Sequence, residues 1–295
     1  MRDALPLDGA PVVSAHPADR ASRSLPLTLL GYAALILAVV AIGMPLYWTV
    51  IASFKQTREI YSIPVTWFPA QPTVENYFKA WAGAPFGRYY LNSLITTIVG
   101  SAAEVFFATT SAYALALLRF PRKELIFVLL LTALMIPAEI TIVPNYLTIA
   151  ALGWTNTYQG IIVPGASVAF GTFLLRQAFR SLPYEVIEAA RVDGAGQLRV
   201  LFSVVLPMAQ PVLVTMALLS VVGKWNDFLW PLLVTNTSDM RTLPIGIYWL
   251  RNQEGVTDWG VVMAGSLFLI VPMLLVFLLA QRSIVEGMTA GAVKG

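Results

Sequence analysis

The sequence predicts an all-α integral membrane protein in which six helices cross the bilayer. Of its 295 residues, 57% are hydrophobic and only 12% are charged, and the mean hydropathy is +0.71. Soluble domains carry about a quarter charged residues, so this composition is too apolar for one. The second observation is a series of apolar runs long enough to cross the hydrocarbon, which takes roughly 20 residues. They cover about 27–52, 90–118, 124–147, 158–178, 206–233 and 260–281.

The first apolar run lies between a polar tail and a long loop. Residues 1–26 contain Pro, Ala and Ser, and we expect them to form a disordered tail. The run that follows is too long for the apolar region of a cleaved signal peptide, which predicts a retained span. This first transmembrane helix and an outer loop together occupy 27–87. Pro64 and Trp67 in that loop predict packing on the outer membrane surface.

The basic residues predict the orientation of the spans. If the N-terminus is inside, the inner segments carry more Lys and Arg than the outer segments, over a similar length of loop. Because basic loops stay on the cytoplasmic side of a membrane, both termini are predicted to be cytoplasmic. The C-terminal tail 282–295 and the polar segment 181–205 then also lie in the cytoplasm.

The composition argues against several classes of function. The formal net charge of +3 comes without a run of basic residues, so we expect no nucleic-acid binding. The chain has no Cys and a single His, His16, which argues against thiolate metal sites and Ser-His catalysis. Gly223-Lys224 is followed by Trp225 rather than Ser or Thr, so it is not a phosphate-binding loop. We therefore expect no cofactor and no enzymatic activity in this chain.

A charged segment, 181–211, interrupts the apolar runs. Ser181 is predicted to cap a helix that takes Pro183 in its first turn, and Gly194 is predicted to end that helix in a left-handed conformation. A second short helix should follow, because apolar residues recur there at helical spacing. These residues are Leu198, Leu201, Phe202 and Val205. The predicted result is a helix, a sharp bend and a helix outside the membrane.

Several residues stand at fixed spacings in this segment. They are Glu188-Ala189-Ala190, Asp193-Gly194-Ala195, Phe202, Leu206-Pro207 and Pro211. The pattern resembles the EAA loop of permease subunits of ATP-binding-cassette (ABC) importers. The resemblance implies that 181–211 is the coupling loop that docks on the ATP-hydrolysing subunit, and that the permease core spans 88–281. The coupling residues that it implies are Glu188, Ala189, Ala190, Asp193, Gly194 and Phe202.

Motifs elsewhere resemble the carbohydrate-type branch of these permeases. They are Asn92-Ser93, Tyr113-Ala114, Met135-Ile136-Pro137 and the ending from Gln281 to Gly295. Segments 225–226, 230–232 and 254–259 are more similar to glycerol-3-phosphate permeases than to the maltose type. The resemblance implies half of a translocation pathway in a prokaryotic cell membrane. It also implies a second permease subunit, in a heterodimer or a homodimer, two ATP-binding subunits and an extracytoplasmic solute-binding protein.

Polar and ionisable side chains within the spans are candidates for the substrate pathway, because charges at membrane depth are costly. The candidates are Glu104, Lys224, Trp225, Asn226 and Asp227. Lys224 and Asp227 are three residues apart on a predicted helix face and can pair. Trp225 and Asn226 offer a stacking surface and hydrogen bonds that suit a polyol or sugar. The alternative is a structural role, with a buried charge pair, an interfacial Trp225 and a Glu104 that faces the helix bundle.

The predicted function is the permease subunit of an ABC importer for glycerol-3-phosphate or a glycerophosphodiester, working by alternating access. Lys224 would attract phosphate if Asp227 does not neutralise it. A neutral sugar or oligosaccharide, held by Trp225 and Asn226, is the alternative solute. A self-sufficient secondary transporter or channel with Glu104 or Glu139 as its ion site is the alternative from another class.

Overall fold

The computed structural model describes residues 25–166, 168–251 and 257–289. Within these residues the regular structure is helical and no strand occurs, which confirms the predicted all-α class. The helices are α1 (Leu25–Ser53), α2 (Thr57–Ile60), α3 (Glu75–Ala82), α4 (Phe86–Leu117), α5 (Lys123–Leu134), α6 (Ala138–Ala151), α7 (Tyr158–Ile162), α8 (Ala169–Arg180), α9 (Tyr184–Val192), α10 (Gln197–Val200), the π-helix η1 (Leu201–Val205), α11 (Leu206–Met208), α12 (Gln210–Trp225), α13 (Leu229–Val234), the 3₁₀-helix η2 (Ser238–Met240), α14 (Leu243–Arg251) and α15 (Trp259–Thr289).

Some predictions fall outside the described residues. They are the tail 1–24 with His16, positions 252–256 in the last outer loop and the end of the C-terminal tail, 290–295. The chain divides into two compact units, residues 1–48 and 49–295, and each is described by itself. In the first unit, α1 exposes apolar side chains such as Leu37 and Ile42. The functional residues discussed below lie in the second unit.

Three helices are long and apolar enough to cross a membrane, over Thr28–Ser53, Phe86–Leu117 and Trp259–Gln281. Two helix pairs qualify only together: α5 with α6, bent by 96°, and Gln197–Met208 with α12, bent by 87°. The described residues therefore hold three candidate spans, or up to five if each bent pair is one span. The fourth predicted run, 158–178, is divided between the short α7 and α8. A count of six spans stays a prediction.

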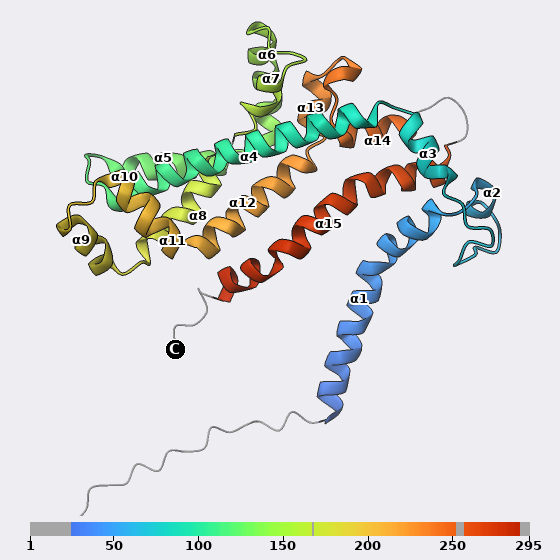
Figure 1. Ribbon diagram of the computed structural model, residues 1–295, viewed down its shortest axis with the longest axis horizontal. Helices are drawn as coiled ribbons and strands as arrows, with labels where there is room; N and C mark the ends of the chain where they lie inside the picture. The colour runs from blue at the N-terminus through green and yellow to red at the C-terminus, as the bar shows by residue number, and fades with distance from the viewer. Residues whose placement is uncertain (1–24, 167, 252–256, 290–295) are drawn as a thin grey trace, which may run out of the picture. The chain divides into compact units, whose positions relative to one another are not determined.

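The centre of the second unit is formed by α4, α8 and α12, which pack against one another (Figure 1). Their buried side chains include Ala108, Leu175 and Met216. Gly171 of α8 allows the close approach, because a Cβ there would lie 2.3 Å from Met216 Cε and 2.9 Å from Ala108 Cβ. α15 packs along α12 on its other side (Figure 1).

The loop between α1 and α4 is held by buried hydrogen bonds. Asn76 of α3 is 3% exposed, and its amide donates to the carbonyls of Ser53 over 2.9 Å and Lys55 over 2.8 Å. Thr57 donates to the Asp258 carboxylate over 2.9 Å, which joins the loop to the start of α15. The described part of this loop is therefore anchored through α3 and the start of α15. Its packing on the outer membrane surface stays a prediction.

Candidate functional site: a helical bend and a membrane cavity

The charged segment folds, as predicted, into a helix, a sharp bend and a helix. α9 ends at Val192 with Asp193 as its C-cap, and Gly194 follows with a φ of +83°. The Ala195 N–H donates to the Ala190 carbonyl and the Gly194 N–H to the Arg191 carbonyl, each over 3.0 Å. These two bonds form a Schellman motif, whose left-handed position favours glycine. The predicted helix end at Gly194 is confirmed.

The start of this helix differs from the prediction. Ser181 is the C-cap of α8, which ends at Arg180, and its hydroxyl donates to the Ala178 carbonyl over 2.8 Å. α9 begins only at Tyr184, after Pro183. Because a proline disfavours the helical conformation of the residue before it, a helix does not start between Ser181 and Pro183. The predicted cap at Ser181 is therefore wrong.

The second helix of the segment contains a π-helical turn, η1. Leu201 and Val205 are buried, whereas Leu198 and Phe202 are 71% and 53% exposed. A π-turn holds more residues than an α-turn, so it changes which positions face the core. The predicted second helix is therefore present, with a π-helical turn inside it.

The predicted coupling residues occupy two different surfaces. Those exposed around the bend are Glu188, Ala189, Asp193 and Gly194. Ala190 is half-buried against the core, and the neighbouring Ile187 is fully buried in it. Phe202 instead lines an apolar groove of about 500 Å³ between α4 and α12, together with Phe106 and Leu213. The structure thus groups the residues of α9 and the bend but places Phe202 apart.

A cleft of about 590 Å³ lies beside Glu188 and is also lined by Arg119 and Gln197. Tyr113 of α4 donates to Gln197 Oε1 over 2.7 Å, which joins the bend to the end of α4. Sequence reasoning missed Arg119 and Gln197 as parts of this site. Neither residue carries a local signal, because exposed polar residues of this kind are common on any protein surface.

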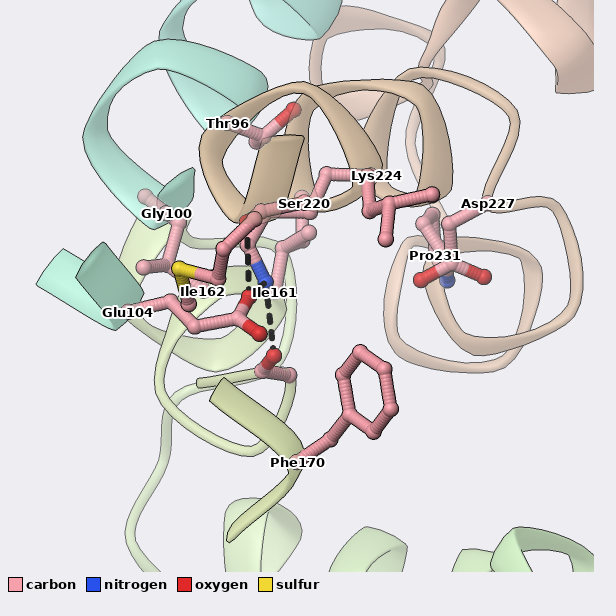
Figure 2. A pocket seen from close by; sticks show the side chains of 14 residues that line it. Thr96, Gly100, Glu104, Ile161, Ile162, Phe170, Ser220, Lys224, Asp227 and Pro231 are labelled. Carbon is pink, nitrogen blue, oxygen red and sulfur yellow. Dashed lines mark hydrogen bonds and ion pairs between the residues drawn. The ribbon is translucent and has the colours of Figure 1, made fainter. Parts of the chain in front are cut away.

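A cavity of about 320 Å³ lies among α4, α7, α8, α12 and α13 (Figure 2). Its charged lining residues are Glu104, Lys224 and Asp227, three of the five predicted pathway residues. Thr96, Ser220 and Phe170 add polar and aromatic surface. In the described part of the chain, no group of three or more His, Cys, Asp or Glu side chains is placed to hold a metal ion.

Lys224 has a different partner from the one predicted. Its Nζ lies 2.8 Å from Glu104 Oε2, in an ion pair between α12 and α4. α12 ends at Trp225, so Asp227 does not continue the helix face that carries Lys224. The spacing argument for a Lys224–Asp227 pair assumed a helix that extends further, and it is wrong for this structure. Figure 2 shows Asp227 on the side of the cavity away from Glu104.

The remaining candidates lie outside the cavity lining. Trp225 is 2% exposed, and its Nε1 donates to the Leu269 carbonyl over 3.1 Å, within a core shared with α15. Asn226 is exposed and donates to the Val222 carbonyl over 2.8 Å. Their roles toward a solute stay predictions, and stacking on Trp225 would require the ring to leave this packing. Glu139 is exposed in the first turn of α6, outside the cavity.

A buried arginine near the bend was also missed. Arg176 of α8 is 2% exposed; its guanidinium pairs with the Glu124 carboxylate at 2.8 Å and lies 3.7 Å from the centre of the Phe127 ring. Its Nε donates to the Leu115 carbonyl over 3.1 Å. The arginine therefore joins α4, α5 and α8.

Comparisons with known proteins agree with these features. Residues 104–285 match the family described as the inner membrane component of binding-protein-dependent transport systems. The chain is 34% identical over 269 residues to the sn-glycerol-3-phosphate transport system permease protein UgpE of Escherichia coli O1:K1 / APEC, covering 89% of this chain and 96% of that protein. It is 36% identical over 267 residues to the probable ABC transporter permease protein YurM of Bacillus subtilis (strain 168), covering 88% of this chain and 87% of that protein.

A solved structure has the same fold. A chain of a bacterial ABC transporter involved in the import of the acidic polysaccharide alginate aligns with a TM-score of 0.80 and 22% identity, over 90% of this chain and 98% of that chain. The helical architecture, the apolar spans and the match to the family agree along most of the sequence. The chain therefore belongs to the family of inner membrane components of binding-protein-dependent transport systems, and it is a permease subunit of an ABC importer.

Proposed function

We propose that this permease imports glycerol-3-phosphate or a glycerophosphodiester. The observation that carries the proposal is its similarity to permeases named for sn-glycerol-3-phosphate transport, both in Escherichia coli and in Brucella abortus (strain 2308), where the identity is 33%. The similarity covers 89% and 88% of the chain. It is therefore not confined to the segment that would contact an ATPase, and it includes the helices that line the cavity.

The chain forms half of the translocation pathway, and a second permease subunit, in a heterodimer, forms the other half. Two ATP-binding subunits on the cytoplasmic side drive transport, and a solute-binding protein delivers the solute from outside. The distribution of basic residues supports this orientation, with both termini and segment 181–211 in the cytoplasm. The protein resides in the cell membrane of a prokaryote.

The bend after α9 couples ATP hydrolysis to movement of the spans. Glu188 and Asp193 are exposed there, and Val192 is 86% exposed, so the bend presents both charge and apolar surface to a partner. Ile187 is buried in the same cluster as side chains of α4, α8 and α12. Because a packed core moves as a unit, a displacement of α9 by the ATPase passes to these helices as a rigid-body movement.

The charges in the cavity favour a neutral sugar or oligosaccharide as the second candidate. Among the described residues that line the cavity, Lys224 is the only basic one, and Glu104 is its ion-pair partner. Asp227 adds a further carboxylate. A phosphate ester therefore gains little attraction from this half of the pathway in the observed conformation, and the second permease subunit must contribute to its recognition.

Competition for uptake tests the proposed solute. The assembled importer, with its binding protein and ATP, is expected to take up labelled glycerol-3-phosphate, and excess glycerophosphocholine is expected to block that uptake. Maltose and trehalose are the matched neutral competitors and should have no effect. Saturable uptake of a neutral disaccharide that phosphate esters do not inhibit would contradict the proposal. Uptake by the chain alone in ATP-free proteoliposomes would instead indicate a secondary transporter or channel.

A further inference from the structure

Glu104 and Lys224 lie at the centre of a cluster that joins three parts of the chain. Besides its ion pair with Glu104, Lys224 Nζ donates to the Gly165 carbonyl over 2.7 Å. The Glu104 oxygen that pairs with Lys224 also accepts a hydrogen bond from Ser220 Oγ over 2.7 Å. α4, α12 and the turn after α7 therefore meet at one pair of charges (Figure 2).

The pair is only partly exposed to solvent. The side chains of Glu104 and Lys224 are 14% and 16% exposed. Opposite charges attract each other more strongly in such a site than in water, so a charge left there without its partner is unfavourable. The two residues are therefore expected to depend on each other, and loss of either one should disturb the helices that both of them join.

Gly100 provides the space for the lysine. It lies one turn before Glu104 on the same face of α4. A Cβ at this position would lie 2.9 Å from Lys224 Cδ and 3.2 Å from Lys224 Cε. A methyl group there would push the middle of the lysine side chain away from α4 while its Nζ is held by two partners. Gly100 thus leaves room beside α4 for the Lys224 side chain, and Glu104 binds its ammonium group.

We infer that Glu104 and Lys224 form a charge-neutral tie, that is, an ion pair that holds α4 and α12 together, and that Gly100 is the positioning residue of this tie. It follows that Lys224 is not the binding site for an anionic solute. A solute anion would have to displace a carboxylate that is tethered beside the ammonium group and therefore present at a high effective concentration. It would also have to break the bond to the Gly165 carbonyl. The inference holds whichever solute is carried.

A charge swap in the assembled importer tests the tie. Glu104→Lys and Lys224→Glu each place two like charges in the cluster, and each is expected to lower ATP-driven uptake of labelled glycerol-3-phosphate about tenfold or more. The double variant restores opposite charges but turns a carboxylate toward the Gly165 carbonyl, so it is expected to recover only part of the uptake that each single variant loses, with an unchanged KM. The melting temperature of the detergent-purified complex should fall in each single variant and recover in part in the double variant.

The possible outcomes distinguish charges that act on each other from charges that act on the solute. Restored melting temperature without restored uptake would show that the charges act on the solute, and a double variant as unstable as the single variants would show that they do not act on each other. Either result overturns the inference. If the wild-type importer takes up no glycerol-3-phosphate, the proposed solute is wrong, and the melting temperatures still decide the role of the pair.

A double-mutant cycle tests Gly100. Gly100→Ala is expected to lower the melting temperature when Lys224 is present and to have little destabilising effect in a Lys224→Ala background, where the nearest remaining side-chain atom is Ile162 Cγ2 at 3.8 Å. The gain in helix propensity from alanine is the same in both backgrounds and cancels in the cycle. Equal destabilisation in the two backgrounds would show that Gly100 does not act through Lys224.

Discussion

Valine in place of Gly194 would test whether the bend after α9 couples the permease to its ATPase. Gly194 has a φ of +83°, a conformation that costs a residue with a Cβ roughly 1–2 kcal/mol and is most unfavourable for a β-branched one. No heavy atom lies within 4 Å of the position that a Cβ would take. The cost is therefore due to the backbone and not to a clash, and it lowers the population of the native bend about 5- to 30-fold relative to alternative conformations.

Gly196 offers a matched control two residues away. Its φ of −67° and ψ of 163° are extended values that valine readily adopts, and a Cβ at this position would also have no heavy atom within 4 Å. Gly196→Val therefore makes the same chemical change without the backbone penalty. We expect this variant to retain transport, because valine adopts this conformation and the other changes are one exposed apolar side chain and a less favourable N-cap for the short α10.

The two variants are compared in the importer reconstituted with its binding protein. Gly194→Val is expected to insert and assemble normally, while solute uptake falls and the solute-loaded binding protein no longer stimulates ATP hydrolysis. Gly196→Val is expected to behave like the wild type. Equal uptake by the two variants, at equal assembly, would refute the assignment of the bend as the coupling element.

Two further predictions concern topology and the Arg176–Glu124 ion pair. In this cysteine-free chain, Ala70→Cys should react with an impermeant thiol reagent added outside and Ala195→Cys should not; the reverse pattern would overturn the orientation and the mechanism with it. Glu124→Ala should lower the melting temperature of the complex more than Arg176→Met. Glu124→Ala leaves the Arg176 charge, which is 2% exposed, without its counterion, whereas Arg176→Met leaves only the Glu124 carboxylate, whose side chain is 66% exposed. A larger loss from Arg176→Met would contradict this explanation.

Local chemistry was sufficient to predict much of the fold. Long apolar stretches predicted α1, α4 and α15, because a segment that crosses a membrane must satisfy its own backbone hydrogen bonds as a helix. Gly194 was predicted to end α9, because glycine adopts a left-handed conformation more readily than any other residue. The start of α9 was misplaced at Ser181, since the effect of Pro183 on its neighbour outweighs the capping preference of serine.

The sequence by itself determined the all-α membrane class, the helical bend and the three charged residues that line the cavity. Only the tertiary structure decided that Lys224 pairs with Glu104 and not with Asp227, and that Trp225 is packed in a core and not in the cavity. The physical reason is that backbone conformation depends mainly on neighbours in the chain, whereas a charge withdrawn from water needs a partner supplied by another helix. The identity of that partner depends on where α12 ends and how closely it approaches α4 at Gly100.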